Sequence, residues 1–315
     1  MIKITAIVPT HNPDRGRLKQ TLHGLAGQTL PRECWELIII DNGSTNARSL
    51  SPGLCAPLEP LPIMVEPTLG LTSARLAGIT ASTAPLLVLV DDDNVLDPNY
   101  LAEAVALFER NPHLGAAGGP ISASFESPPP RWTHEFFPLL ALRDLGVSEV
   151  FTPLPEGAQI SGYPECAPVG AGMVLRRECG IKYQQSLMNR PGRLSLDRKG
   201  KSLTSGGDND LALTVLEAGW QVGYSPKLKL THLIPNQRLT VNYLARLQHD
   251  LARSWILVLA EHGICPWPPV PRYSVFLRKL RAWFRHQAWR GRSNYIRWRG
   301  ACGTFEGRSR ILKPS

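Results

Sequence analysis

The chain lacks long apolar runs, and none of its six cysteines has a close partner in sequence. The longest apolar runs, at residues 37–40, 86–90 and 256–260, are far shorter than the roughly 20 residues of a membrane-spanning helix. Scattered cysteines without a Cys-x-x-Cys pair argue against a zinc site or disulfide framework and favour reduced thiols. The N-terminal residues also lack the features of a signal peptide. These absences predict a cytoplasmic protein.

Acidic residues are nearly absent from the C-terminal stretch. From residue 272 onward there are twelve Lys or Arg and one acid, Glu306, whereas residues 1–271 hold 23 basic and 25 acidic residues. The net charge of +9 therefore belongs to the tail. The rest of the 315-residue chain has an ordinary globular composition and is long enough to bury a large core.

The tail is amphipathic at a helical period. An apolar side suits an anionic bilayer surface when basic residues flank it, and such binding would hold the protein at the inner face of the membrane, near a lipid-linked acceptor. The alternatives are that the apolar side packs on the main domain or pairs with another subunit; nucleic acid is not an expected partner. The apolar residues are Phe276, Leu280, Trp283 and Phe284, and the basic residues are Arg278, Lys279, Arg281 and Arg285.

Three consecutive carboxylates, Asp91, Asp92 and Asp93, follow the apolar run 86–90. The run predicts a strand buried on both faces, and ligands bind at the carboxyl ends of such strands in open α/β sheets. If the backbone stays extended, Asp91 and Asp93 point to one side and Asp92 to the other. Adjacent carboxylates repel one another unless a cation holds them, and oxygen ligands favour Mg²⁺ or Mn²⁺. The alternative is a solvated acidic turn that caps the next helix.

Two other predicted strands end in polar residues at the same edge. Residues 4–8 lead into Pro9, Thr10 and Asn12, and residues 35–40 lead into Asp41, which is either a ligand-facing or a turn residue. A third short strand is expected at 63–65. Helices are expected at 18–25, from Gly70 to Gly78 with Arg75 near its start, and at 99–110. Arg75 fits either a diphosphate contact or a surface position.

The second half is less regular. Residues 116–121 are predicted to form a strand. Residues 122–166 are predicted to form a long proline-rich loop with several aromatic residues, Trp132 among them. This loop is a candidate lid or acceptor contact, and the alternative is an irregular packing segment. Residues 169–177 are strand-like, with Gly170, Ala171 and Gly172 allowing close approach of a ligand. Residues 182–201 read as polar and mobile.

Acidic residues then open a helix at 205–219. Asp208 is either a catalytic residue or the N-cap, and both roles can coexist. A strand pair at 221–230 leads to His232; a lone histidine there is more often a hydrogen-bonded core residue than a ligand. A largely apolar helix follows at 242–262.

The order of these motifs resembles the family 2 glycosyltransferases of the GT-A fold over residues 2 to about 240. The motifs are Pro-Thr-His-Asn, Asp-Asn-Gly-Ser, Gly-Leu-Thr-Ser-Ala-Arg, Asp-Asp-Asp-Asn, Gly-Ala-Gly-Met, Gly-Gly-Asp-Asn-Asp-Leu and His-Leu-Ile-Pro. The resemblance implies an α/β fold with a mostly parallel sheet flanked by helices. Residues 1–120 would be the Rossmann-like nucleotide-sugar-binding half, 121–240 the acceptor and catalytic half, and 241–315 a basic helical extension.

The resemblance also implies site residues around a nucleotide-sugar and a divalent metal ion, Mn²⁺ or Mg²⁺. The metal would be held by Asp91, Asp93 and His232, and the sugar and acceptor would lie near Gly170, Ala171, Gly172 and Trp132. The nucleotide-sugar would contact Pro9, Thr10, Asn12, Asp41, Gly70, Arg75, Asp91 and Asp92.

Asp208 matches the aspartate that deprotonates the acceptor hydroxyl in that family. Gly207 departs from the pattern, because the family usually has Glu there. Asp210 is the candidate for the missing charge, so the base is Asp208 or Asp210, with Asp208 favoured. The predicted activity is metal-dependent, inverting transfer of a sugar, by default from a UDP-sugar, to a glycan or lipid-linked acceptor. The alternatives are a nucleotide-sugar-binding protein without turnover, or a nucleotidyltransferase. A nucleotidyltransferase would need a Gly-rich phosphate loop after the first strand, and the Pro-Thr-His-Asn-Pro stretch that begins at Pro9 is not such a loop.

Overall fold

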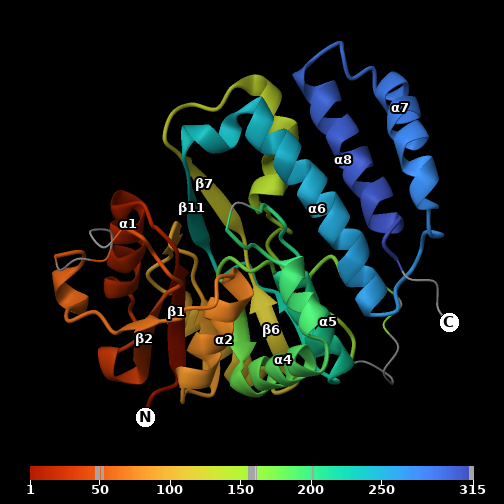
Figure 1. Cartoon of the computed structure of the whole chain (residues 1–315). Helices are drawn as coiled ribbons and strands as arrows, with labels where there is room; N and C mark the ends of the chain where they lie inside the picture. Colours follow the sequence, from red (N-terminus) through yellow and green to blue (C-terminus); the bar gives the residue numbers. More distant parts are fainter. Residues whose placement is uncertain (47–49, 51–52, 155–159, 161, 201, 312–315) are drawn as a thin grey trace.

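The computed structural model describes residues 1–46, 50, 53–154, 160, 162–200 and 202–311. Residues 155–159 and 161 of the proline-rich excursion, residue 201 and the last four residues of the tail lie outside the described residues. The molecule is built on a central sheet with helices on both faces, and three helices near the C-terminus pack along one side (Figure 1). This is the expected mostly parallel α/β sheet, and it has the GT-A fold.

The central sheet has eight strands. β1, β2, β3 and β4 run parallel, as do β6 and β10, whereas β9 is antiparallel to both of its neighbours and β8 to β10. The apolar residues of the inner strands are buried because helices cover both faces, whereas Ile63, Met64 and Val65 of the edge strand β3 and Val150 of β8 are exposed. In sheet order the strands are β3 (Ile63–Val65), β2 (Trp35–Asp41), β1 (Ile4–Thr10), β4 (Leu86–Leu89), β9 (Val174–Arg176), β6 (Leu114–Gly118), β10 (Gln221–Tyr224) and β8 (Val150–Phe151).

The helices form two layers, each with its own hydrophobic core. Asp14 caps the first helix, since its carboxylate accepts the Arg17 N–H at 3.0 Å. Gly78 lets α2 approach β1 closely, because a Cβ there would lie 2.4 Å from Ile7 Cγ2. One layer contains α1 (Arg15–Ala26) and α3 (Tyr100–Arg110), and the other α2 (Leu71–Ala81), α4 (Arg177–Asn189) and α5 (Gly207–Glu217).

A second, three-stranded sheet differs from the prediction. The single strand expected at 116–121 is divided, since β6 ends at Gly118 and β7 (Ile121–Phe125) joins β11 (Leu230–Ile234) and β5 (Asn94–Leu96). The turn between them depends on Gly119, where a Cβ would lie 2.1 Å from the Leu228 carbonyl oxygen. The expected strand at 169–177 is likewise shorter, because α4 begins at Arg177.

The prediction that residues 182–201 are polar and mobile is wrong for the described part. Most of this segment forms α4 and the short helix η5 (Pro191–Leu196). Tyr183 and Leu187, one helical turn apart, are buried against α5, and the buried Arg193 pairs with an acid of α5. A buried ion pair between distant residues leaves no periodic signal in the sequence.

The C-terminal helices are α6 (Val241–Glu261), α7 (Val275–Arg285) and α8 (Arg292–Arg308) (Figure 1). α8 lies close along α6 through Gly300, Gly303 and Gly307, where a Cβ would meet α6 at 2.1–2.9 Å. Among the described residues, no helix is both long enough and apolar enough to span a bilayer. The remaining short helices are η1 (Arg32–Cys34), η3 (Ala56–Leu58), η4 (Arg131–Leu140), η6 (Asn236–Leu239) and η7 (Arg272–Ser274).

Candidate active site

A cavity of about 440 Å³ opens at the carboxyl edge of the parallel strands, within the size range of ligand sites in proteins. Its walls come from the ends of β1, β2 and β4, the start of α2, and the loop before α5, and α6 and η4 close it from the other side. Eleven of the predicted site residues line it: Pro9, Thr10, Gly70, Arg75, Asp91, Asp92, Asp93, Gly170, Ala171, Asp208 and His232.

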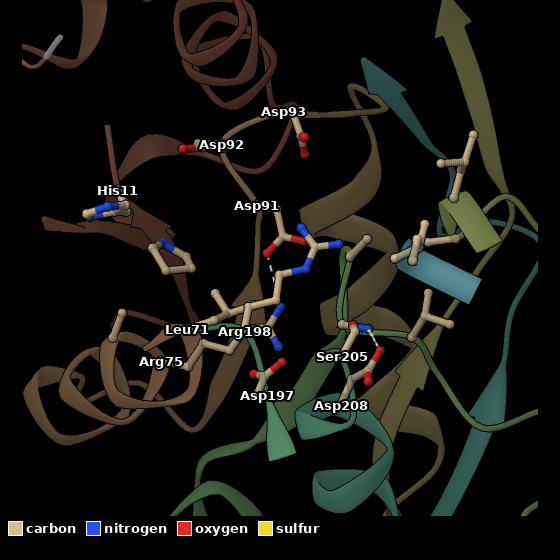
Figure 2. A pocket seen from close by; sticks show the side chains of 18 of the residues that line it. His11, Leu71, Arg75, Asp91, Asp92, Asp93, Asp197, Arg198, Ser205 and Asp208 are labelled. Atoms are coloured by element: carbon tan, nitrogen blue, oxygen red, sulfur yellow. Dashed lines mark hydrogen bonds and ion pairs between the residues drawn. The ribbon is translucent and has the colours of Figure 1, made fainter. Parts of the chain in front are cut away.

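The three consecutive aspartates form a turn, which we call the acidic turn (residues 91–93). β4 ends at Leu89 and the chain turns at residues 92–93, so the extended backbone on which the predicted side-chain directions depended is not present. Asp91 accepts a hydrogen bond from Arg75 Nη2 at 3.0 Å, and Asp92 one from the Thr10 hydroxyl at 2.5 Å. Asp93 accepts from Arg238 Nη2 at 2.7 Å. Figure 2 shows Asp92 and Asp93 pointing apart.

Burial and neighbouring charges shift the pKa values of Asp92 and Asp93 in opposite directions. Burial, followed by the charge of Asp93, raises the pKa of Asp92 to about 7. Burial would also raise the pKa of Asp93, but the Arg238 guanidinium and His232 outweigh it and hold that pKa well below its usual range. Asp93 therefore stays ionised and can attract a cation, whereas Asp92 is partly protonated near neutral pH.

His232 is both a buried hydrogen-bonded residue and part of the cavity wall. Its Nδ1 lies 2.9 Å from the Leu140 carbonyl oxygen, and its Nε2 lies 2.8 Å from Arg238 Nη1 and 3.5 Å from Asp93 Oδ2. A carbonyl only accepts, so this partner places a hydrogen on Nδ1.

Arg75 is the central cation of the site. The residue is 7% exposed, and its guanidinium packs against Gly170, where a Cβ would lie 2.7 Å from Nη2. Asp91, Asp197 and Asp208 all raise the pKa of Arg75, outweighing its burial. Its buried Nε has no hydrogen-bond partner among the described residues.

Asp208 lies across the cavity from the acidic turn (Figure 2). The backbone N–H of Gly170 donates to its Oδ2 and that of Asn209 to its Oδ1, both at 2.9 Å. Burial raises the pKa of Asp208, which makes the carboxylate a better proton acceptor. It is not the N-cap of α5, because Gly206 holds that position.

Asp210 does not reach the cavity, which counts against it as the base. It is fully buried, with Oδ1 2.7 Å from Arg193 Nη2 and 2.9 Å from His262 Nε2. Residues two apart on a helix face different sides, so with Asp208 turned to the cavity Asp210 turns to the core.

Four other predicted residues lie outside the cavity lining. Asn12 accepts backbone N–H groups of Thr45 and Asn46, and Asp41 accepts that of Ser44, which is the turn role considered for it. Their neighbours His11 and Asn42 line the cavity instead.

The other two of these four are Gly172 and Trp132. Gly172 has φ +73° and its carbonyl accepts the Tyr100 hydroxyl behind the wall. The ring of Trp132 lies beneath the guanidinium of Arg292 at the start of α8, so residues 138–141 at the end of η4 face the cavity in its place.

The cavity also contains residues that the sequence analysis missed. Arg238 follows β11 by four residues, and a basic residue shortly after a strand end was the available signal for it. Asp197, Arg198 and Ser205 come from the loop before α5, which carries no periodic pattern. Residues of α6 complete the wall: Tyr243, Leu247 and Leu251.

The donor set fits a hard divalent cation that also binds a ligand. No group of three or more His, Cys, Asp or Glu within the described ranges is arranged to hold a metal by itself. Two carboxylates facing the cavity, Asp91 and Asp93, suffice where substrate phosphates supply the other oxygens, as is usual for Mg²⁺.

A GT-A sheet with a cavity at its strand ends and carboxylates on the facing walls of that cavity is the arrangement expected of a glycosyltransferase. Residues 5–179 match the family described as Glycosyl transferase family 2, and the chain belongs to that family.

Relatives with related names support the assignment. The chain is 27% identical to the succinoglycan biosynthesis protein ExoM of Rhizobium meliloti (strain 1021), over 79% of this chain and 74% of the relative. It is 26% identical to an N-acetylglucosaminyltransferase of Sinorhizobium fredii, over 74% of this chain and 53% of the relative. A second such enzyme, from Mesorhizobium japonicum, is 25% identical over 74% of this chain and 52% of the relative. The chain thus spans about half the length of these N-acetylglucosaminyltransferases.

Proposed function

We propose that this protein is a metal-dependent, inverting glycosyltransferase that moves a sugar from a UDP-sugar to a hydroxyl of a glycan or lipid-linked acceptor in polysaccharide synthesis. The observation that carries the proposal is the meeting of the acidic turn and Asp208 on facing walls of one cavity. Residues far apart in the chain converge there.

The donor would lie along the strand ends. Thr10 and Gly70 line this part of the cavity, and Asn42 holds the Gly70 loop by accepting its N–H at 2.8 Å. Arg75, which lines the cavity, is the cation placed to meet a diphosphate.

Asp91 and Asp93 would hold a divalent ion on that diphosphate. When bound, the ion neutralises the negative charge that develops on the departing nucleoside diphosphate. The chain's own contribution is to keep Asp93 ionised, through Arg238 and His232, and to exclude water with η4 and α6.

Asp208 would take the proton from the incoming hydroxyl. Its burial raises its proton affinity, and its position opposite the acidic turn suits attack on the far side of the anomeric carbon from the leaving group. A single displacement of this geometry inverts the configuration. Among the described cavity residues we identify no second nucleophile that a retaining route would need.

The names of the relatives suggest UDP-N-acetylglucosamine as the first donor to test. With Mn²⁺ present it should raise the melting temperature and be slowly hydrolysed, with the β-anomer of the sugar appearing first. Asp93→Asn should lose the Mn²⁺-dependent part of the thermal shift, and Asp208→Asn should keep the shift but lose about 10²–10⁴-fold in hydrolysis. Asp144→Asn, at an exposed position outside the cavity, is the matched control.

Two results would refute this assignment. One is a protein that binds UDP-N-acetylglucosamine with no hydrolysis and no transfer to any tested glycan or lipid-linked acceptor, which would leave a binding protein. The other is an initial α-anomer, which would rule out inversion.

We also place the protein at the cytoplasmic face of an anionic membrane, through α7. Its outer face leaves large apolar side chains exposed, and exposed arginines flank them, so the charge matches an anionic bilayer. All six cysteines are free thiols, as suits a reducing compartment. The exposed apolar residues, which we call the α7 face, are Tyr273, Phe276, Leu277, Leu280, Phe284 and Trp289, and the arginines are Arg272, Arg281, Arg285 and Arg290.

Flotation with vesicles tests this placement. The protein should float with phosphatidylglycerol vesicles and not with phosphatidylcholine vesicles, and replacing Phe276, Leu280 and Phe284 together by Ser should abolish flotation. Val147→Ser with Met188→Ser removes equally exposed apolar residues elsewhere and should leave binding unchanged. Equal flotation of both variants would refute the α7 face as the contact.

A further inference from the structure

Gly207 stands where family 2 glycosyltransferases usually have Glu. In this structure, another segment of the chain occupies the space that a side chain at position 207 would take. A Cβ built on Gly207 would lie 2.3 Å from Asp197 Oδ2 and 2.6 Å from its Cγ. The carboxyl group of Asp197 therefore occupies the place into which a side chain at position 207 would project. A carboxylate is present at the start of α5 although the residue before Asp208 is a glycine.

The backbone holds Asp197 firmly in this place. The loop that follows η5 is tied to the rest of the fold by two hydrogen bonds, from the Gly206 N–H to the Leu196 carbonyl at 2.9 Å and from the Leu71 N–H to the Arg198 carbonyl at 3.0 Å. The Thr72 hydroxyl donates to Asp197 Oδ2 at 2.8 Å. These hydrogen bonds anchor the loop to the starts of both α2 and α5 and so hold the Asp197 side chain in place.

Asp197 belongs to the cavity and not only to the core. It is 3% exposed, yet it lines the cavity together with Asp208 and Arg75 (Figure 2). Among the residues that the structure describes, Thr72 is the one side chain that hydrogen-bonds to Asp197, and a neutral amide could satisfy it as well. A buried carboxylate at this place is therefore better explained by its charge than by its hydrogen bond.

We propose that Asp197 supplies the second carboxylate of an acidic pair with Asp208, taking the place of the glutamate that position 207 lacks, and acts as a positioning residue for the base. The inference rests on the proposed function. Asp197 does not take the proton itself. Its negative charge makes Asp208 bind a proton more tightly, and its contact with Gly207 sets the start of the helix that carries Asp208.

The groups around Asp208 give the direction of this effect. Burial is the main cause that raises the pKa of Asp208, and the charge of Asp197 raises it further. The N–H groups of Gly170 and Asn209 and the charge of Arg75 lower it. Tyr163, also close, remains neutral, because burial raises its pKa. Removing the charge of Asp197 leaves the opposing groups in place, so the pKa of Asp208 must fall.

Carboxyl ¹³C NMR of protein labelled at aspartate tests the proposal without any substrate, with the Asp208 signal assigned through Asp208→Asn. Asp197→Asn should lower the pKa of Asp208. The exchange Asp197→Gly with Gly207→Glu should restore it, because the glycine opens the space and the glutamate returns the charge. The matched control, Asp197→Gly with Gly207→Gln, has the same shape without the charge and should not restore it.

Hydrolysis of UDP-N-acetylglucosamine with Mn²⁺ is the second measurement. Asp197→Asn should lower kcat at neutral pH by less than Asp208→Asn does, and should move the acidic limb of the pH profile to lower pH, since a weaker base loses its proton earlier. Asp197→Gly with Gly207→Glu should restore kcat and the position of the acidic limb of the pH profile. Asp197→Gly with Gly207→Gln should restore neither.

The outcomes separate the two proposals. An Asp208 pKa that is the same in Asp197→Asn and wild type overturns the acidic pair, whatever the activity, as does equal behaviour of the Glu and Gln exchanges. If the pKa shifts as expected but Asp208→Asn retains full hydrolysis, the pair stands and the role of Asp208 as base fails.

Discussion

At the scale of single residues, Gly170 connects the two walls of the cavity. Its N–H holds Asp208, and its missing side chain leaves room for the guanidinium of Arg75. One position therefore places both the candidate base and the candidate diphosphate contact, although the glycine itself has no functional group.

Gly170→Ala should weaken nucleotide binding more than it weakens the fold. The added methyl would lie 2.7 Å from Arg75 Nη2, so the guanidinium must move away from Asp91. We expect the Kd for UDP, measured by calorimetry with Mn²⁺, to rise about 10-fold or more, which corresponds to about 1.4 kcal/mol. Gly162→Ala, where no atom lies within 4 Å of the new Cβ, should leave the Kd unchanged. An unchanged Kd in Gly170→Ala would exclude Arg75 as a donor contact.

Residue identity allowed part of the site to be predicted. The acidic turn, Thr10 and Asp208 were found because each lies at the end of a buried strand or the start of a helix. Asp197 was not, because an irregular loop brings it to the site through tertiary contacts alone. The helical spacing of Asp208 and Asp210 already implied that only one could face a ligand.

At the scale of elements, a buried polar cluster joins η5, α5 and the end of α6. Asp210 lies between Arg193 and His262, and His262 Nδ1 also lies 2.7 Å from Glu217. Both partners of the imidazole accept, so the geometry calls for a ring protonated on both nitrogens. Burial lowers the pKa of His262, but Asp210 and Glu217 outweigh it and raise the pKa overall.

This cluster predicts a pH-dependent stability. A raised folded-state pKa gives stabilisation that is fully present below the unfolded value, about 6.5, and is lost as pH rises through the folded value. His262→Gln should cost about 1.5–3 kcal/mol of unfolding free energy at pH 6, and progressively less at higher pH.

Urea unfolding at several pH values measures the effect. His286 supplies the control, because burial and then the charge of Arg285 lower its pKa, so the difference between wild type and His286→Gln should change in the opposite direction with pH. A His262→Gln effect that does not depend on pH would show that the ring acts only by packing.

The packing of α8 on α6 gives a second prediction at this scale. A Cβ on Gly303 would lie 2.1 Å from the His249 carbonyl oxygen, which is backbone and cannot turn aside. Gly303→Ala should therefore destabilise the protein by about 1–3 kcal/mol in urea unfolding. Gly291→Ala, in open space with extended backbone, should not, and equal stability of the two variants would contradict the close helix contact.

Apolar periodicity predicted most elements, including β1, β2, β4, α3 and α6, because their faces bury apolar residues. It did not predict the pairing of α8 with α6. That contact depends on glycines, which add no hydrophobic signal, and on a partner helix that is distant in sequence.

At the scale of the whole molecule, charge is divided between a nearly neutral body and a basic tail. α8 packs on α6, whereas the α7 face stays exposed, so Phe276, Leu280 and Phe284 do not pack on the main domain. Binding to phosphatidylglycerol vesicles should therefore weaken steeply as NaCl rises from 0.05 to about 0.5 M, because salt screens the arginines, while a residual apolar contribution remains. Flotation that is independent of salt would exclude an electrostatic contribution.

The 21-residue helix α6 has neighbours on both sides. One side contributes Tyr243, Leu247 and Leu251 to the cavity, and the other receives α8, which in turn carries α7. α6 and α8 thus link the cavity wall to the surface that would rest on the lipid. If that surface is anchored, the mouth of the cavity sits at a constant height and tilt above the bilayer. The height of the cavity above the bilayer would then limit the length of a lipid-linked acceptor, because the growing end of a longer chain would no longer lie at the cavity.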